Sequence, residues 1–137
     1  MLDLRWHEFY SLDVDFLDEE HQRLLAIMRQ IKKAIEANDM EIASQELSFL
    51  LESAEAHFKS EEKFLEELNY PGLEEHKKYH QELINQGKYM KDICEGIVED
   101  QDVALCFKGM SRFIIDDIFK GDIKFKSFID DVRETGR

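Results

Sequence analysis

The chain has 137 residues, 43% of them hydrophobic, which is enough for the core of a single domain over residues 1–137. Its 31 acidic and 18 basic residues give a formal charge of -13, which argues against nucleic acid or an anionic membrane as a partner, because both would repel such a surface. No apolar run approaches the length that crosses a bilayer, and the N-terminus lacks a basic segment followed by an apolar one, so we expect a cytoplasmic protein. The acidic surface permits a monomer.

The first segments predict an arm and then a helix. Residues 1–17 are rich in aromatic side chains without a regular period, which suits an arm packed across a bundle. Asp18 is a candidate N-cap, and the apolar stripe that follows has a 3.6-residue period and includes His21. This helix is predicted to end near Asn38 and Asp39.

A second helix is predicted from about Met40 to Leu68. Its apolar stripe contains His57 and Glu61, so an acidic residue stands where apolar residues are expected. The only proline of the chain lies in residues 69–72 and marks a sharp turn to a third helix. Two histidines four residues apart lie on the inner face of that third helix.

A fourth helix is predicted to open near Asp100 or Asp102 and to stop at Gly121. Its period places Asp117 on the inner face, and Asp122 lies just beyond the stop, where a loop could aim it into the mouth of the bundle. The tail predicts a short closing helix. Four long amphipathic helices with short connections predict an all-α, up-down-up-down four-helix bundle with an N-terminal arm.

The two cysteines, Cys94 and Cys106, form no Cys-x-x-Cys motif and stand among apolar neighbours. Buried free cysteines commonly pack as small apolar residues. We therefore expect reduced core residues rather than a disulfide or a redox pair.

Four of the five histidines fall into a metal-ligand arrangement. The pairs His57 with Glu61 and His76 with His80 have i,i+4 spacing, so each pair projects from one helix face and can close on an ion. A lone histidine would more often be an ordinary surface or core residue. Two such pairs, together with His21 in phase with an apolar stripe, instead favour a buried metal centre. Imidazole and carboxylate ligands suit iron, manganese, zinc or copper.

Several short motifs stand in a fixed order along the chain. They are Trp6, Asp18-Glu19-Glu20-His21-Gln22-x-x-Leu25, His57-Phe58-x-x-Glu61-Glu62, Tyr70-Pro71 and His76-x-x-x-His80. In this order and spacing they resemble the hemerythrin family, specifically the single-domain bacterial hemerythrins, and the resemblance covers nearly the whole chain.

The resemblance implies a non-haem centre of two iron ions, joined by an oxo or hydroxo bridge, that binds dioxygen. It implies that one iron is bound by His21 and His57, that the other is bound by His76 and His80, and that Glu61 and Asp122 bridge them. It further implies a dioxygen pocket lined by Leu24, Phe58, Phe113, Ile114 and Ile118, although each of these also fits ordinary core packing.

One position departs from the family pattern. Where the last helix of the family usually supplies a fifth histidine, this chain has Asp117. A carboxylate ligand would make the centre more negative by one charge than a neutral imidazole and would favour the oxidised metal state. We expect Asp117 to ligate a metal; the alternative is that it lies in solvent and binds nothing.

Three functions follow from these observations. The first is dioxygen binding for oxygen storage, delivery or sensing. The second is a di-iron peroxidase or oxidase that consumes peroxide or dioxygen, which is favoured by a carboxylate at Asp117. The third is a metal-storage or metal-sensing bundle without oxygen chemistry.

Overall fold

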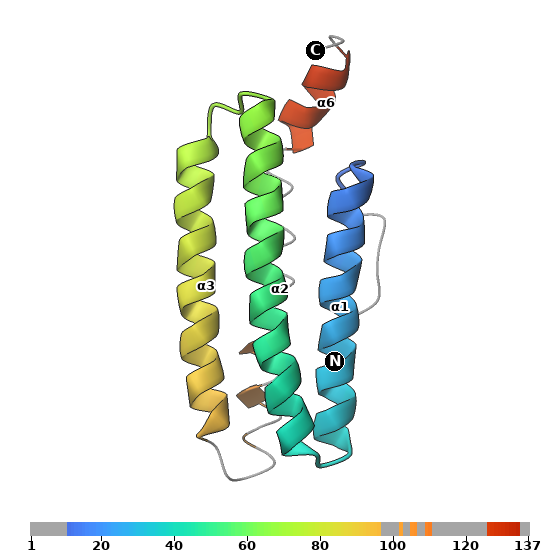
Figure 1. Ribbon diagram of the computed structural model, residues 1–137, viewed down its shortest axis with the longest axis vertical. Coiled ribbons are helices and arrows are strands. Elements are labelled where there is room, and N and C mark those ends of the chain that lie inside the picture. Colours follow the sequence, from blue (N-terminus) through green and yellow to red (C-terminus); the bar gives the residue numbers. More distant parts are fainter. Residues whose placement is uncertain (1–10, 97–101, 103–104, 107–108, 111–125, 135–137) are drawn as a thin grey trace.

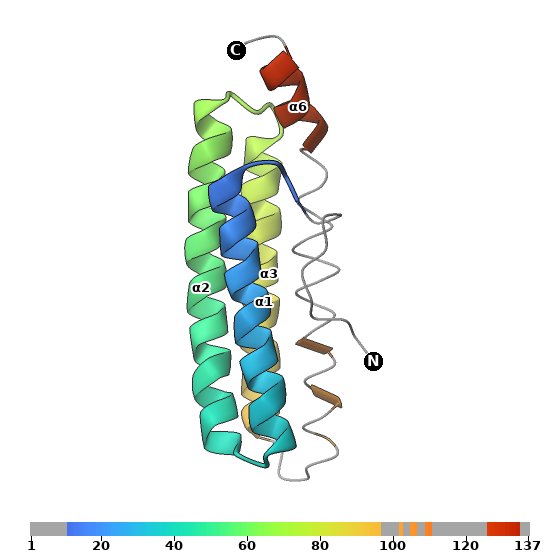
Figure 2. The same ribbon diagram turned by 90° about the vertical axis from the view of Figure 1, so that its right-hand side faces the viewer.

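The fold is an all-α four-helix bundle, as the sequence predicts. The computed structural model describes residues 11–96, 102, 105–106, 109–110 and 126–134. Among these residues the main helices are α1 (Asp15–Glu36), α2 (Met40–Glu67), α3 (Leu73–Glu95) and α6 (Lys126–Glu134). The three long helices lie side by side, and α6 sits at the end of the bundle where α2 turns into α3 (Figures 1 and 2). None of the helices described is long and apolar enough to cross a membrane.

The predicted start of the first helix was wrong. Helix α1 begins at Asp15, and Val14 rather than Asp18 occupies the N-cap position. The Asp18 carboxylate lies inside the first turn, where it accepts hydrogen bonds from the Leu12 backbone N–H at 2.9 Å and from the Ser11 hydroxyl at 2.6 Å. It therefore fixes the chain that enters the helix instead of capping the helix itself.

The turns on either side of α2 agree with the sequence pattern. Asp39 caps α2, because its carboxylate accepts a hydrogen bond from the Ile42 backbone N–H at 3.2 Å. Asn38 and Asn69 have φ angles of 60° and 57°, a left-handed conformation that asparagine tolerates better than most residues. These short turns make α1 and α3 antiparallel to α2. The short closing helix predicted for the tail is confirmed as α6.

Within the part of the chain that the structure describes, the buried apolar side chains form two clusters. The larger one runs along the three long helices. The smaller one, which we call the closing cluster, consists of Leu12, Val14, Leu17, Leu65 and Ile129. Leu17 precedes His21 by one helical turn, and Leu65 follows Glu61 by one turn. The closing cluster therefore covers the end of the bundle nearest the predicted metal ligands, and Ile129 of α6 is part of that cover.

The two cysteines are not reduced core residues, contrary to the expectation from the sequence. Cys94 in the last turn of α3 and Cys106 form a disulfide, and their Cα atoms lie 5.9 Å apart. Both side chains are half-buried. The two cysteines are separated by 12 residues, so residues that share no local motif become neighbours in space.

Candidate metal centre

The structure brings five predicted ligands together in the interior. Helix α1 supplies His21, α2 supplies His57 and Glu61, and α3 supplies His76 and His80. All five side chains are buried, and Glu61 and His21 have no exposed surface at all. The i,i+4 spacing on α2 and α3 acts as expected, because both members of each pair face the same interior space.

Their ligand atoms form two overlapping groups of three. The first group is His21, His57 and Glu61, and the second is Glu61, His76 and His80; within each group the candidate ligand atoms lie within 4.8 Å of one another. Glu61 belongs to both groups. A carboxylate has two oxygen atoms, so one glutamate can serve two neighbouring ions.

The two oxygens of Glu61 face different histidines. Oε1 lies 2.5 Å from Nε2 of His76 and 3.0 Å from Nε2 of His80, whereas Oε2 lies 3.3 Å from Nε2 of His57. Burial strongly opposes ionisation of Glu61, but hydrogen bonds with these three histidines outweigh it and hold the pKa of Glu61 well below its ordinary range. The centre thus contains a fully buried carboxylate in its charged form.

Two further carboxylates lie behind the histidines. The Nδ1–H group of His57 donates to Oε1 of Glu20 at 2.7 Å, and the Nδ1–H group of His80 donates to Oε2 of Glu62 at 2.7 Å. The proton of each ring is therefore held at Nδ1, and a neutral ring carries its lone pair at Nε2, which points into the centre.

This arrangement fits metal binding. A neutral His57 or His80 presents an Nε2 lone pair to a Glu61 oxygen, and two acceptors at this distance repel one another. Either a proton or a metal ion must lie between them. Neighbouring ligands on an ion with bonds of about 2 Å lie about 3 Å apart, which is close to the separations of 2.5 to 3.3 Å seen around Glu61.

The remaining predicted site residues divide into two sets. Of the predicted pocket, Leu24 and Phe58 are buried, with 1% and 2% exposure, and the Phe58 ring stacks on the His80 ring at a centroid distance of 4.0 Å. The others, namely Phe113, Ile114, Asp117, Ile118 and Asp122, lie outside the described residues, so their roles stay predictions.

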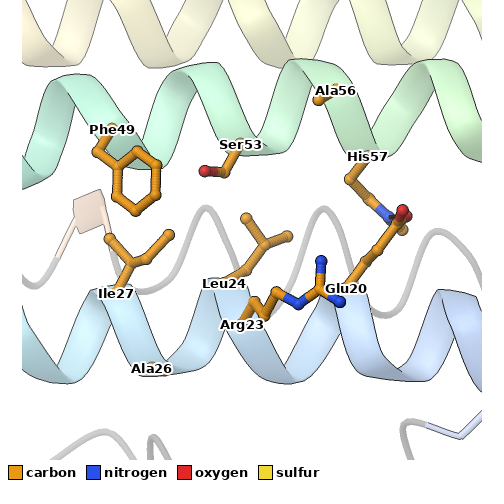
Figure 3. Close-up of a pocket in the computed structure, with 9 residues that line it drawn as sticks. All are labelled: Glu20, Arg23, Leu24, Ala26, Ile27, Phe49, Ser53, Ala56 and His57. Atoms are coloured by element: carbon orange, nitrogen blue, oxygen red, sulfur yellow. Dashed lines mark hydrogen bonds and ion pairs between the residues drawn. The ribbon is translucent and has the colours of Figure 1, made fainter.

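A surface groove lies between α1 and α2 and is lined by one of the five grouped ligands, His57. It has a volume of about 400 Å³, and His57 and Glu20 lie at one end of it while Phe49 lies at the other (Figure 3). A smaller hollow of about 190 Å³ lies between α2 and α3, where Glu62 and His80 form part of its wall. Glu20 and Glu62, which we call the outer carboxylates, thus each line a surface hollow together with the histidine that they contact.

Reasoning from the sequence assigned no role to Glu20 or Glu62. The Glu62 side chain is only 21% exposed and contacts His80. The signal that could have found both is adjacency, because each of them is next in the chain to a predicted ligand, Glu20 to His21 and Glu62 to Glu61.

Comparison with known proteins agrees with this geometry. Residues 12–130 match the family model described as the hemerythrin HHE cation binding domain. The chain is 30% identical to a myohemerythrin of Riftia pachyptila over 120 residues, which cover 86% of this chain and 92% of the relative. It is 25% identical to a myohemerythrin of Theromyzon tessulatum over 122 residues, covering 89% and 90%. It is 26% identical to a bacteriohemerythrin of Campylobacter jejuni subsp. jejuni over 123 residues, covering 87% and 86%.

Proposed function

The chain belongs to the hemerythrin family, whose members hold a non-haem di-iron centre and bind dioxygen, and on that premise we propose that it binds dioxygen reversibly for storage, delivery or sensing. The observation that carries the proposal is Glu61, a buried carboxylate shared by two groups of histidines. One shared carboxylate between two such groups is what a pair of adjacent ions requires, whereas a single ion would leave one group without a role.

In this proposal each metal has its own histidines. His21 and His57 would hold one iron and His76 and His80 the other, and Glu61, which belongs to both groups, would be shared between them. Asp122 is proposed as a second bridge and Asp117 as a further ligand. Four neutral imidazoles leave most of the positive charge of the two ions to be balanced by carboxylates, which is consistent with the acidic character of these positions.

When bound, the iron pair supplies the electrons that dioxygen binding requires. The side chains around the iron pair determine the shape of the adjacent space and exclude water from it. Leu24 and Phe58 are buried next to the histidines and exclude water from them. The stack of Phe58 on His80 also fixes the plane of that ring.

The test of the proposal starts with metal content and an absorption spectrum of protein purified without oxygen. We expect two irons per chain and a visible band that appears in air and fades when the gas is evacuated. Irreversible oxidation would contradict reversible binding and favour a peroxidase or oxidase. A different metal, loaded without any spectrum that depends on oxygen, would favour a storage or sensing bundle.

Variants of α2 test the ligand assignment. We expect His57→Ala and Glu61→Ala to abolish loading of the iron pair while much of the helix content, measured by circular dichroism, is retained. Glu66→Ala is the matched control, because Glu66 is an exposed glutamate on the same helix. A normal iron load in both ligand variants would refute the assignment.

A further inference from the structure

We propose that Glu20 and Glu62 are positioning residues, one for each metal, that hold His57 and His80 with Nε2 directed at the centre. The inference rests on the metal centre of the proposed function but not on its oxygen chemistry. Neither carboxylate is close enough to the centre to be one of its grouped ligands, and each touches it only through a histidine ring.

Helices α1 and α2 each carry a pair of adjacent residues with the same division of roles. In the pair Glu20-His21 of α1, the histidine enters the centre and the glutamate reaches across to His57 on α2. In the pair Glu61-Glu62 of α2, the first glutamate enters the centre, and the second reaches across to a histidine of α3. Each helix thus gives a ligand and, at the adjacent position, a support for a ligand on the next helix.

The burial of these carboxylates indicates that their position matters. The side chains of Glu20 and Glu62 are 22% and 21% exposed, whereas that of Glu19, one residue away, is 67% exposed. Withdrawing a carboxylate from water is unfavourable unless a hydrogen bond compensates it. At 2.7 Å the two hydrogen bonds have the length expected of charge-assisted ones.

The consequence for the metals is twofold. A carboxylate that accepts the Nδ1 proton selects the tautomer with a lone pair at Nε2, and it limits rotation of the ring. The negative charge of the carboxylate also makes the imidazole more basic, so that its Nε2 lone pair binds a metal ion more strongly. Because Glu20 acts on His57 and Glu62 acts on His80, changes at the two positions should affect different metals.

The experiment uses Zn²⁺ as the probe, because zinc takes the same ligands and performs no redox chemistry. Zinc affinity is measured by competition with a coloured chelator for the wild type and for Glu20→Ala, Glu62→Ala and the corresponding Gln variants. We expect each Ala variant to bind one of two zinc ions about 10- to 100-fold more weakly. We expect Gln to recover part of this loss, since its amide oxygen can accept the Nδ1 proton but carries no charge.

The ring protons give a readout that a general loss of stability would not produce. In the zinc-loaded wild type, nuclear magnetic resonance should detect slowly exchanging Nδ1–H protons on His57 and His80. Glu20→Ala should lose protection only at His57, and Glu62→Ala only at His80. If an Ala variant fails to fold, the near-isosteric Gln variant replaces it, and we expect a smaller loss of protection at the same histidine and none at the other.

Glu19→Ala is the matched control, because it removes the same charge from the neighbouring position without a hydrogen bond to the centre. The inference would be overturned if Glu19→Ala lost as much zinc affinity as Glu20→Ala and Glu62→Ala. It would also be overturned if Glu20→Ala and Glu62→Ala both bound zinc as tightly as the wild type. If the wild type binds two zinc ions as expected but its iron form does not bind dioxygen reversibly, only the proposed function fails. If the wild type takes up no zinc, both fail.

Discussion

Removal of the disulfide between Cys94 and Cys106 should destabilise the fold by a predictable amount. The bond closes a loop with a sequence separation of 12 residues. A cross-link over a loop of this size restricts the unfolded chain by about 3 kcal/mol in the chain-entropy model. For a protein of this length, such a change corresponds to a melting temperature about 10 °C lower. The perturbation is the double substitution Cys94→Ala with Cys106→Ala, which leaves no free thiol to form dimers.

The assay is urea unfolding followed by circular dichroism, with both proteins prepared at the same metal content, because bound metal adds its own stabilisation. Treatment of the wild type with a phosphine reductant should produce a similar loss. The same treatment should leave the double variant unchanged. A difference below about 1 kcal/mol between wild type and variant would refute the loop-closure reasoning.

Three further predictions concern the interior and a helix end. Burial raises the pKa of Glu61, but the histidines lower it by more, so the net pKa is depressed. The metal-free wild type should therefore lose stability as the pH falls from about 5 through the depressed pKa. Glu61→Gln should not show this loss when urea unfolding is measured at each pH. Phe58→Ala should cost about 3–5 kcal/mol in unfolding and loosen the His80 ring, whereas Phe49→Ala, at a side chain that is 54% exposed, should cost far less. Asp39→Ala should remove about 1 kcal/mol by uncapping α2, and Asp39→Asn should restore most of it.

The helices that carry the ligands could be predicted from the sequence because their signals are local. The period of 3.6 residues and the turn residues Asn38 and Asn69 set the helix lengths within a few positions. An acidic residue on an apolar stripe could be recognised as unusual because burying a charge without a partner is unfavourable. The sequence alone therefore singles out Glu61 as a functional residue, and the structure buries it completely.

The features that could not be predicted depend on contacts between segments that are distant in the sequence. Glu20 lies at the edge of its helix face, and only the position of α2 decides whether it meets His57 or water. Cys94 and Cys106 are separated by 12 residues and become neighbours only in the folded chain. The sequence around Asp18 resembles that of a helix N-cap, but its carboxylate accepts hydrogen bonds from Ser11 and Leu12 in the segment that precedes the helix. In each case the partner, rather than the residue type, determines the role.

The closing cluster has a consequence for the order of events during synthesis. Ribosomes make proteins from the N-terminus, and Ile129 follows all five of the grouped ligands in the chain. Every grouped ligand is therefore synthesised before Ile129 completes the apolar cover at that end of the bundle, so docking of α6 is the last step in burying the ligands.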